Sequence, residues 1–307
     1  MAITTKNFQF LTDIDLAWNL LLKSAMPIGN NGMPAPFFEY ALSSSWMDKN
    51  QLYLNRFWLD DGEAVAFVYY ENPANHIFFA LLPSYEHLAD EMIDYTDRYM
   101  PKKAGERELV LFPGQKALIE AAERKGYALA YAYDDMLLDF EKTALNFPLP
   151  EGFRFVDPKD IDPVKMAVCC WKGFDHEDKG PFENWEDEDP GTDWNPQKAY
   201  QGVINSFLAP PPHATYDYEV VIADEAGEYA CYSGMCWVKE NALAYMEPLC
   251  TIPKYRGRGL AAAALSKHYQ TFKPMGAKYM TGGGNAFYAK IGYTEKIHWM
   301  HYKKEKK

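Results

Sequence analysis

A chain of 307 residues is long for one compact domain and comfortable for two domains of about 150 residues each. Its formal charge of -12 argues against nucleic acid as a partner, because phosphate binding requires a basic surface. No apolar run approaches the length of a membrane span, and the N-terminus shows no secretory signal, so we expect a cytoplasmic protein without a membrane partner.

The first half of the chain alternates β-rich and helical patterns. An apolar helix is expected over Asp15–Lys23. Two β-rich runs, Leu52–Leu59 and Ala64–Glu71, flank an Asp-Asp-Gly-Glu turn and predict a hairpin. A third strand at His76–Leu82 precedes a helix at Tyr85–Tyr99.

The two halves end alike, in a helix that stops at a glycine followed by a strand-rich tail. Gly126 closes the first of these helices and Gly292 closes the second. This similarity predicts a duplicated unit with its boundary in the proline-containing stretch 146–150. The expected domains are therefore residues 1–145 and residues 146–307.

The second half repeats the scheme of the first. Strands are expected at Tyr218–Ala223, Tyr229–Val238 and Ala242–Thr251, followed by a helix at Leu260–Phe272 and a short strand at Lys278–Thr281. Strands interleaved with helices predict an α/β chain of the α+β type, in which mixed, mostly antiparallel sheets are flanked by helices.

A stretch rich in acidic residues, proline and tryptophan interrupts this scheme between Phe174 and Pro212. One interpretation is a solvated surface loop. The other is a lid over an acceptor pocket, because Phe182, Trp185 and Trp194 are large aromatic residues for a free linker. The sequence leaves both interpretations open.

The five cysteines all lie in the second half, and none form a Cys-x-x-Cys pair. Their odd number and spacing argue against a disulfide scaffold and against a structural zinc site. The histidines show no convincing metal-ligand spacing either, so we expect no metal.

The segment 247–261 leads from a β-rich run through a glycine-containing turn into an alanine-rich helix. Gly257 and Gly259 allow the backbone to approach a phosphate closely. The helix that follows leaves its first N–H groups unpaired and carries about half a positive charge at its N-terminus. The turn therefore predicts a pyrophosphate cradle. A P-loop is excluded, since no Gly-Lys-Ser/Thr follows.

The pattern Arg256-x-x-Gly259-x-Ala261 resembles the acetyl-CoA signature of the GCN5-related N-acetyltransferase (GNAT) superfamily. The segment from Asn285 through Tyr288 to the following Gly-Tyr resembles the C-terminal motif of the family, in which the Asn commonly lies one turn earlier.

The corresponding turn of the first half, residues 82–91, has no glycine and carries acidic residues. The whole chain thus resembles a tandem GNAT protein whose N-terminal copy is degenerate.

The resemblance implies that the C-terminal domain binds acetyl-CoA. In the family the pantetheine arm lies along the strand before the cradle, so a backbone N–H of Leu249 or Cys250 would hold the thioester oxygen. The residues expected to contact the cofactor are Leu249, Cys250, Thr251, Arg256, Gly257, Arg258, Gly259, Leu260, Ala261, Ala262, Asn285 and Tyr288.

Acyl transfer to an amine needs a base for the acceptor ammonium and an acid for the leaving thiolate. Tyr288 is the candidate acid by its motif position; alternatively it is a buried aromatic residue that holds the last helix. Glu247 is the candidate base, acting directly or through a water, because a carboxylate in a predicted core strand is costly without a purpose. Alternatively Glu247 is a structural carboxylate. A covalent intermediate on Cys250 is a further alternative to direct transfer.

The resemblance implies an N-acetyltransferase that moves an acetyl group from acetyl-CoA to a small-molecule or peptide amine by direct transfer. The alternative is a non-catalytic CoA-binding or regulatory module. The sequence leaves the identity of the acceptor and the oligomeric state open.

Overall fold

The computed structural model describes residues 2–44, 47–176, 204 and 207–304. Their contacts divide the chain into two compact units. Unit 1 comprises Met1–Leu42, Met47–Asp135 and Lys296–Lys307, and unit 2 comprises Ser43–Trp46 and Met136–Glu295. In the part of the chain that the structure describes, no helix is long and apolar enough to cross a membrane.

Unit 1 contains a mixed sheet with the strand order β1-β2-β3-β4-β5-β12. The strands are β1 (Thr4–Asn7), β2 (Arg56–Asp60), β3 (Glu63–Tyr70), β4 (His76–Leu81), β5 (Glu108–Leu111) and β12 (Glu295–Lys304). β4 and β5 are parallel, and the other neighbouring pairs are antiparallel. The predicted hairpin is confirmed as β2–β3, although Leu52–Leu54 forms a 3-10 turn before it.

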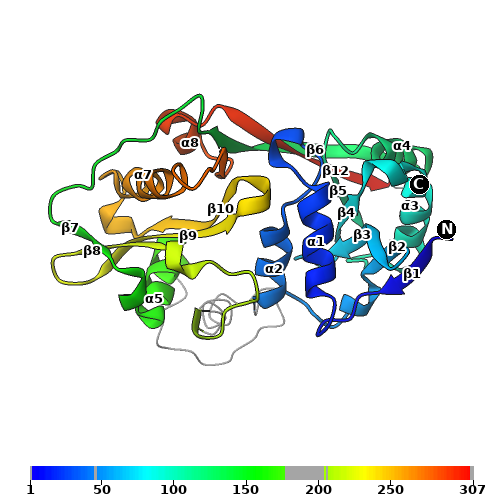
Figure 1. The fold of residues 1–307 in the computed structure, drawn as a ribbon, viewed down its shortest axis with the longest axis horizontal. Helices are drawn as coiled ribbons and strands as arrows, with labels where there is room; N and C mark the ends of the chain where they lie inside the picture. The colour runs from blue at the N-terminus through cyan, green and yellow to red at the C-terminus, as the bar shows by residue number, and fades with distance from the viewer. Residues whose placement is uncertain (1, 45–46, 177–203, 205–206, 305–307) are drawn as a thin grey trace. The chain divides into compact units, whose positions relative to one another are not determined.

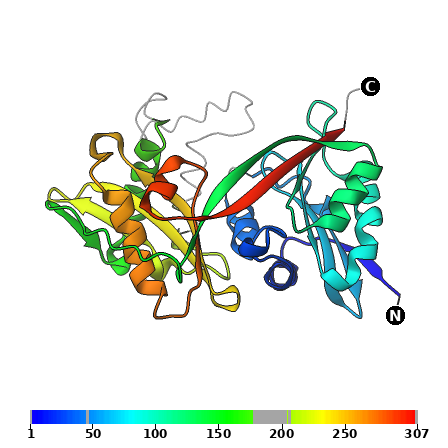
Figure 2. The ribbon, with the colours of Figure 1, turned by 90° about the horizontal axis from the view of Figure 1, so that it is seen from above.

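Helices lie on both faces of this sheet. α1 (Ile14–Ser24) and α2 (Ala35–Ser43) lie on one face, and α3 (Ala89–Tyr99) and α4 (Lys116–Arg124) lie on the other (Figure 2). β3 is therefore buried at every position after its first residue, which explains its continuous apolar run, since a strand covered on both faces has no solvent-facing positions.

The strands of unit 2 are paired in the order β11-β10-β9-β8-β7. Its strands are β7 (Phe153–Val156), β8 (Val220–Asp224), β9 (Tyr229–Val238), β10 (Leu243–Thr251) and β11 (Tyr279–Thr281). All neighbouring pairs are antiparallel except β10 and β11, which are parallel. The last residues of β6 (Tyr127–Asp139) pair with β11 and extend this sheet.

α5 (Pro163–Gly173) and α7 (Leu260–Phe272) cover opposite faces of the unit 2 sheet (Figure 1). The alternation along β8 shows this directly: Val221 packs in the cluster of α5, and Val220 packs in the cluster of α7. α5 begins where Asp162 accepts hydrogen bonds from the amides of residues 164 and 165, with proline at the first helical position. The short α8 (Ala286–Ile291) follows β11.

The two units do not follow the predicted boundary at residue 145. Residues 136–145 group with unit 2, and residues 296–307 group with unit 1, where β12 pairs with β5. The division into domains 1–145 and 146–307 stays a prediction about the duplicated sequence. The loop or lid expected between Phe174 and Pro212 lies largely outside the described residues.

Candidate cofactor site

The parallel strands β10 and β11 separate at the position where the cofactor site is expected. They pair at Leu243–Tyr279 and at Ala244–Met280. The Met246 amide then donates to the Thr281 hydroxyl at 2.7 Å, and β11 ends at this residue. β10 continues to Thr251, and no described strand pairs with residues 247–251 on the β11 side. An extended molecule can therefore hydrogen-bond to the main chain there.

A bulge in β10 accompanies this separation. The register with β9 shifts between Met246 and Leu249, which places the bulge at Glu247 and Pro248. Gly234 of β9 faces the bulge, and a Cβ atom on this residue would overlap the carbonyl oxygen of Glu247. Glycine at position 234 is therefore required for the close approach of the two backbones.

The predicted cradle lies at the N-terminus of α7. Gly257 and Gly259 adopt φ values of 75° and 88°, in the left-handed region that favours glycine. Among the described hydrogen bonds, the first to close this end of the helix runs from the Ala263 amide to the Gly259 carbonyl, at 3.0 Å. The amides of residues 260–262 thus lack a helical partner, and no acidic side chain occupies the first turn. This geometry suits an anion.

Unit 1 differs at the corresponding turn. After β4 the chain forms a 3-10 segment, Pro83–Leu88, and α3 then begins with two carboxylates, Asp90 and Glu91, in its first turn. Glu91 accepts a hydrogen bond from the Trp58 indole at 2.8 Å, and Asp90 pairs with Arg124 at 2.9 Å. Two carboxylates in the first turn disfavour an anion at this helix end, in agreement with the acidic sequence.

Arg256 holds the cradle loop to the end of α5. Its guanidinium donates to the Gly173 carbonyl at 2.7 Å and to the Thr251 carbonyl at 3.1 Å, and it pairs with Asp175 at 2.9 Å. Its predicted contribution to phosphate binding stays a prediction. Arg258 lies 4.8 Å from the centre of the Phe153 ring and forms no ion pair with any described residue.

The structure corrects the argument that singled out Glu247. Its side chain is exposed, because the bulge turns it away from the core, so the expected cost of burying a carboxylate does not arise. Cys250 is buried at 5% exposure, and its thiol lies 3.8 Å from the Cys169 carbonyl beneath α5. The thiol is thus a core group in the described structure.

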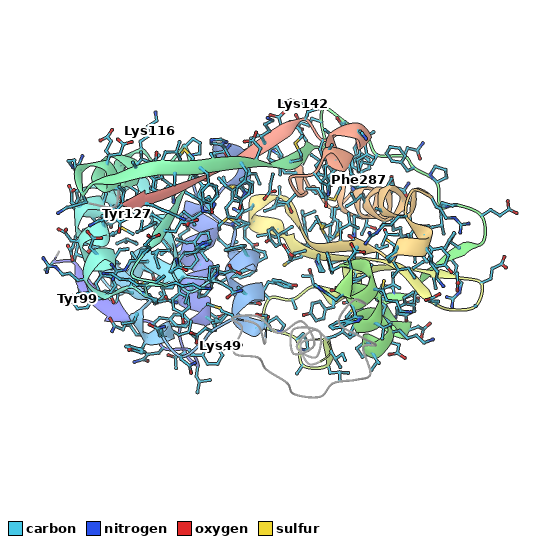
Figure 3. All side chains as sticks on the ribbon, turned by 180° about the vertical axis from the view of Figure 1, so that it is seen from behind. Lys49, Tyr99, Lys116, Tyr127, Lys142 and Phe287 are labelled. Carbon is cyan, nitrogen blue, oxygen red and sulfur yellow. The ribbon has the colours of Figure 1, made fainter. Side chains whose placement is uncertain are left out.

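Tyr288 is buried and packs against the glycine-rich turn after β11. A Cβ on Gly282 would lie 2.6 Å from the Tyr288 ring, so this turn needs its glycine. Tyr288 belongs to the same apolar cluster as Met246, and Leu249 packs against that cluster, which brings the predicted acid to the region of the bulge. Phe287, labelled in Figure 3, lies edge-on to Tyr288 at 5.2 Å between ring centres.

Asn285 has a role that the family motif did not indicate. Its side-chain oxygen accepts the Phe287 amide at 2.9 Å and caps α8. A contact between this side chain and the cofactor stays a prediction. The side-chain oxygen already accepts the Phe287 amide, so such a contact would use the amide nitrogen.

Two buried polar pairs in unit 2 were missed at the level of sequence. Tyr232 donates to Glu219 at 2.9 Å on the α5 side, and His268 and Ser233 lie 3.1 Å apart on the α7 side. Burial raises the pKa of Glu219 to about 8 and lowers the pKa of His268 to about 3, so both groups are neutral at pH 7. The signal for Glu219 was present: a carboxylate inside an apolar β-rich run.

One group of described side chains could hold a metal, and it lies in unit 1. His76, Glu108 and His301 place one ligand atom each within 4.8 Å of one another. The two oxygens of Glu108 already accept from Tyr131, His301 and the Lys303 ammonium, each at 2.5 Å. A cation would compete with that ammonium, so we interpret the group as a hydrogen-bonded cluster, and the absence of a metal stays a prediction.

Comparisons with known proteins place this geometry in a known fold. No family model and no curated protein matches the sequence. Among solved structures, a GNAT-family acetyltransferase from Colwellia psychrerythraea covers 100% of both chains at a TM-score of 0.58 and 10% identity. The match to a GCN5-related N-acetyltransferase from Sphaerobacter thermophilus covers 99% of this chain and 95% of that protein, with a TM-score of 0.55 and 14% identity. The match to a tandem GNAT protein from the clavulanic acid biosynthesis pathway covers 98% of each chain, with a TM-score of 0.52 and 11% identity.

These likenesses span both units. The chain has the GNAT fold, and the predicted fold class, mixed sheets flanked by helices, is confirmed.

Proposed function

We propose that the chain transfers an acetyl group from acetyl-CoA to an amine, with the cofactor held by unit 2. The observation that carries the proposal is the separation of β10 and β11 at Thr281, directly before the cradle at the start of α7. A strand edge followed by unpaired helical amides matches the chemistry of pantetheine, whose amides need main-chain partners, and of pyrophosphate, which needs N–H donors.

Within this proposal the main chain of residues 247–251 binds the pantetheine arm, and the amides of residues 257–262 bind the pyrophosphate. Tyr288 supplies the proton for the departing thiolate. Glu247, exposed beside the bulge, attracts the acceptor ammonium and takes up its proton through a water. The acceptor is a small-molecule or peptide amine, and neither nucleic acid nor a membrane takes part.

The test is direct detection of free CoA when the protein is mixed with acetyl-CoA and a panel of amines. We expect CoA release that depends on both protein and amine. Binding of acetyl-CoA without release, for every amine in the panel, would instead favour the non-catalytic CoA-binding module. Absence of binding would contradict both functions.

Tyr288→Phe is expected to lower kcat by about 10²-fold or more, while the affinity for acetyl-CoA changes little. The ring and its packing against Gly282 remain, so only the hydroxyl is lost. Steady-state kinetics with calorimetry of acetyl-CoA binding measures both quantities. Wild-type turnover in this variant would leave Tyr288 as a packing residue.

A further inference from the structure

Glu219 is a buried carboxyl group that the proposed chemistry does not yet use. It lies directly before β8 at 5% exposure, and one of its oxygens accepts a hydrogen bond from the Tyr232 phenol at 2.9 Å. The other oxygen, Oε2, has no hydrogen-bond partner among the described residues and is fully shielded from solvent. A buried polar atom without a partner is costly, so this arrangement calls for a reason.

The partner of Glu219 lies beside the bulge. The Tyr232 phenol oxygen is 2.9 Å from the point that a Cβ on Gly234 would occupy, and the carbonyl oxygen of Glu247 borders the same point. Because Gly234 has no Cβ, the Tyr232 phenol can lie close to the backbone of the bulge. Tyr232 packs in the α5 cluster together with Cys250, so the pair lies under the part of β10 that would carry the thioester.

The described titratable groups nearest to Glu219 come from β9, α5 and the start of β8. Tyr232 of β9 lowers its pKa, while burial raises it to about 8, and the Cys170 thiol of α5 lies near enough for Glu219 to raise the pKa of that thiol. Asp217 and Lys267 line a hollow of about 80 Å³ together with Glu219. Glutamine has the same volume and no proton to lose. The carboxyl group therefore lowers stability relative to glutamine above its unfolded-state pKa of about 4.3, and this penalty grows until about pH 8.

We propose that Glu219 is a positioning residue that receives the acceptor's proton through the phenol of Tyr232, in place of the route through a water to Glu247. The inference rests on the proposed function. In the step, the acceptor ammonium gives one proton to the Tyr232 oxygen while the phenol gives its own proton to the Glu219 carboxylate. The amine lone pair then attacks the thioester carbon, the C–N bond forms, and the C–S bond breaks. Tyr288 gives its proton to the CoA thiolate, and the second proton lost by nitrogen restores the Tyr288 phenol.

The test compares the pH dependence of kcat in wild type, Glu219→Gln, Tyr232→Phe and the double variant. Wild-type kcat should rise with pH, reach half of its maximum near pH 8 and level off above that value, as Glu219 ionises. In Glu219→Gln we expect turnover about 10²-fold lower and no such rise. Tyr232→Phe should lose as much, and the double variant should lose no more than either single variant, because both residues serve one proton route.

Thermal unfolding separates this role from a structural one. Folding binds the Glu219 proton, so the stability associated with this group is present at acidic pH and is lost as the pH rises towards about 8. Glu219→Gln should therefore melt at the same or a higher temperature than wild type at neutral pH. A lower melting temperature with a parallel loss of turnover would make Glu219 a structural residue and overturn the proposal.

Glu247→Gln is the matched substitution at the exposed carboxylate. If kcat of Glu247→Gln still rises near pH 8, the result supports Glu219. If the rise is lost in Glu247→Gln but remains in Glu219→Gln, Glu247 is the group that receives the proton. An inactive wild type overturns the proposed function and this inference together. An active wild type with an unchanged profile in Glu219→Gln overturns the inference alone.

Discussion

Replacement of Gly259 by Asp is expected to weaken acetyl-CoA binding by about 10²-fold or more. The residue has a φ of 88° and caps α7, so a side chain there is strained and places a carboxylate among the amides that bind the pyrophosphate. Loss of two charge-assisted hydrogen bonds, each worth about 1.5–3 kcal/mol, accounts for this factor. Titration calorimetry of wild type should show one site per chain.

Gly276→Asp is the matched control for that variant. Gly276 also has a positive φ, 93°, and has no neighbour within 4 Å of its virtual Cβ, but it lies at the other end of α7, beyond Phe272. Gly259→Asp and Gly276→Asp therefore introduce a similar backbone strain and the same charge, but only Gly259→Asp does so at the cradle. An equal loss of affinity in both variants, undiminished binding by Gly259→Asp, or two equivalent sites per chain would refute the cradle.

Glu108→Gln is expected to destabilise the protein by about 3 kcal/mol. The Glu108 side chain is 4% exposed and joins His301 and Lys303 of β12 to Tyr131 of β6, so its neutralisation removes the charged acceptor of this network. The Lys303 ammonium, at 38% exposure, keeps its contact with water. Asp90→Asn breaks an exposed ion pair with Arg124 in the same unit and should cost less than about 1 kcal/mol. Chemical denaturation measures both.

The same cluster predicts how stability varies with pH. Burial alone would raise the pKa of Glu108, but the bonds from Lys303 and Tyr131 hold it below its usual range, and burial lowers the pKa of His301. The carboxylate thus favours folding above its unfolded-state pKa. Both shifts mean that unfolding takes up protons as the pH falls below about 6.5.

Wild-type stability should therefore decline in acid, with a shallower decline in Glu108→Gln. A chelator should leave the wild-type curve unchanged if the cluster holds no metal. A loss of stability on chelation would show instead that His76, Glu108 and His301 bind one.

The parts of the site that depend on neighbours in sequence were predictable. The turn with Gly257 and Gly259 and the helix after it are local, because backbone conformation and unpaired helical amides follow from a few consecutive residues. The order of most strands and helices was predictable for the same reason, although the short strands β1 and β5 were not predicted. One exception is α2, whose apolar residues Ala35–Ser43 give little amphipathic contrast.

The parts that depend on pairing were not predictable. The exposure of Glu247 follows from a bulge that needs Gly234 on another strand, and a strand pattern alone places that carboxylate in the core. Tyr232 and Glu219 meet only through the register of β8 with β9. His301 and Glu108 lie 193 residues apart in the chain, and no spacing rule connects them.

The placement of β12 has a consequence for how the chain is made. β5 is synthesised long before the strand that covers its edge, because all of residues 136–295 come between them. Until β12 leaves the ribosome, nascent unit 1 carries an unpaired β5 edge, and such an edge can pair with another chain. Truncation or stalling before residue 296 should therefore yield aggregates built on unit 1 rather than a smaller working protein.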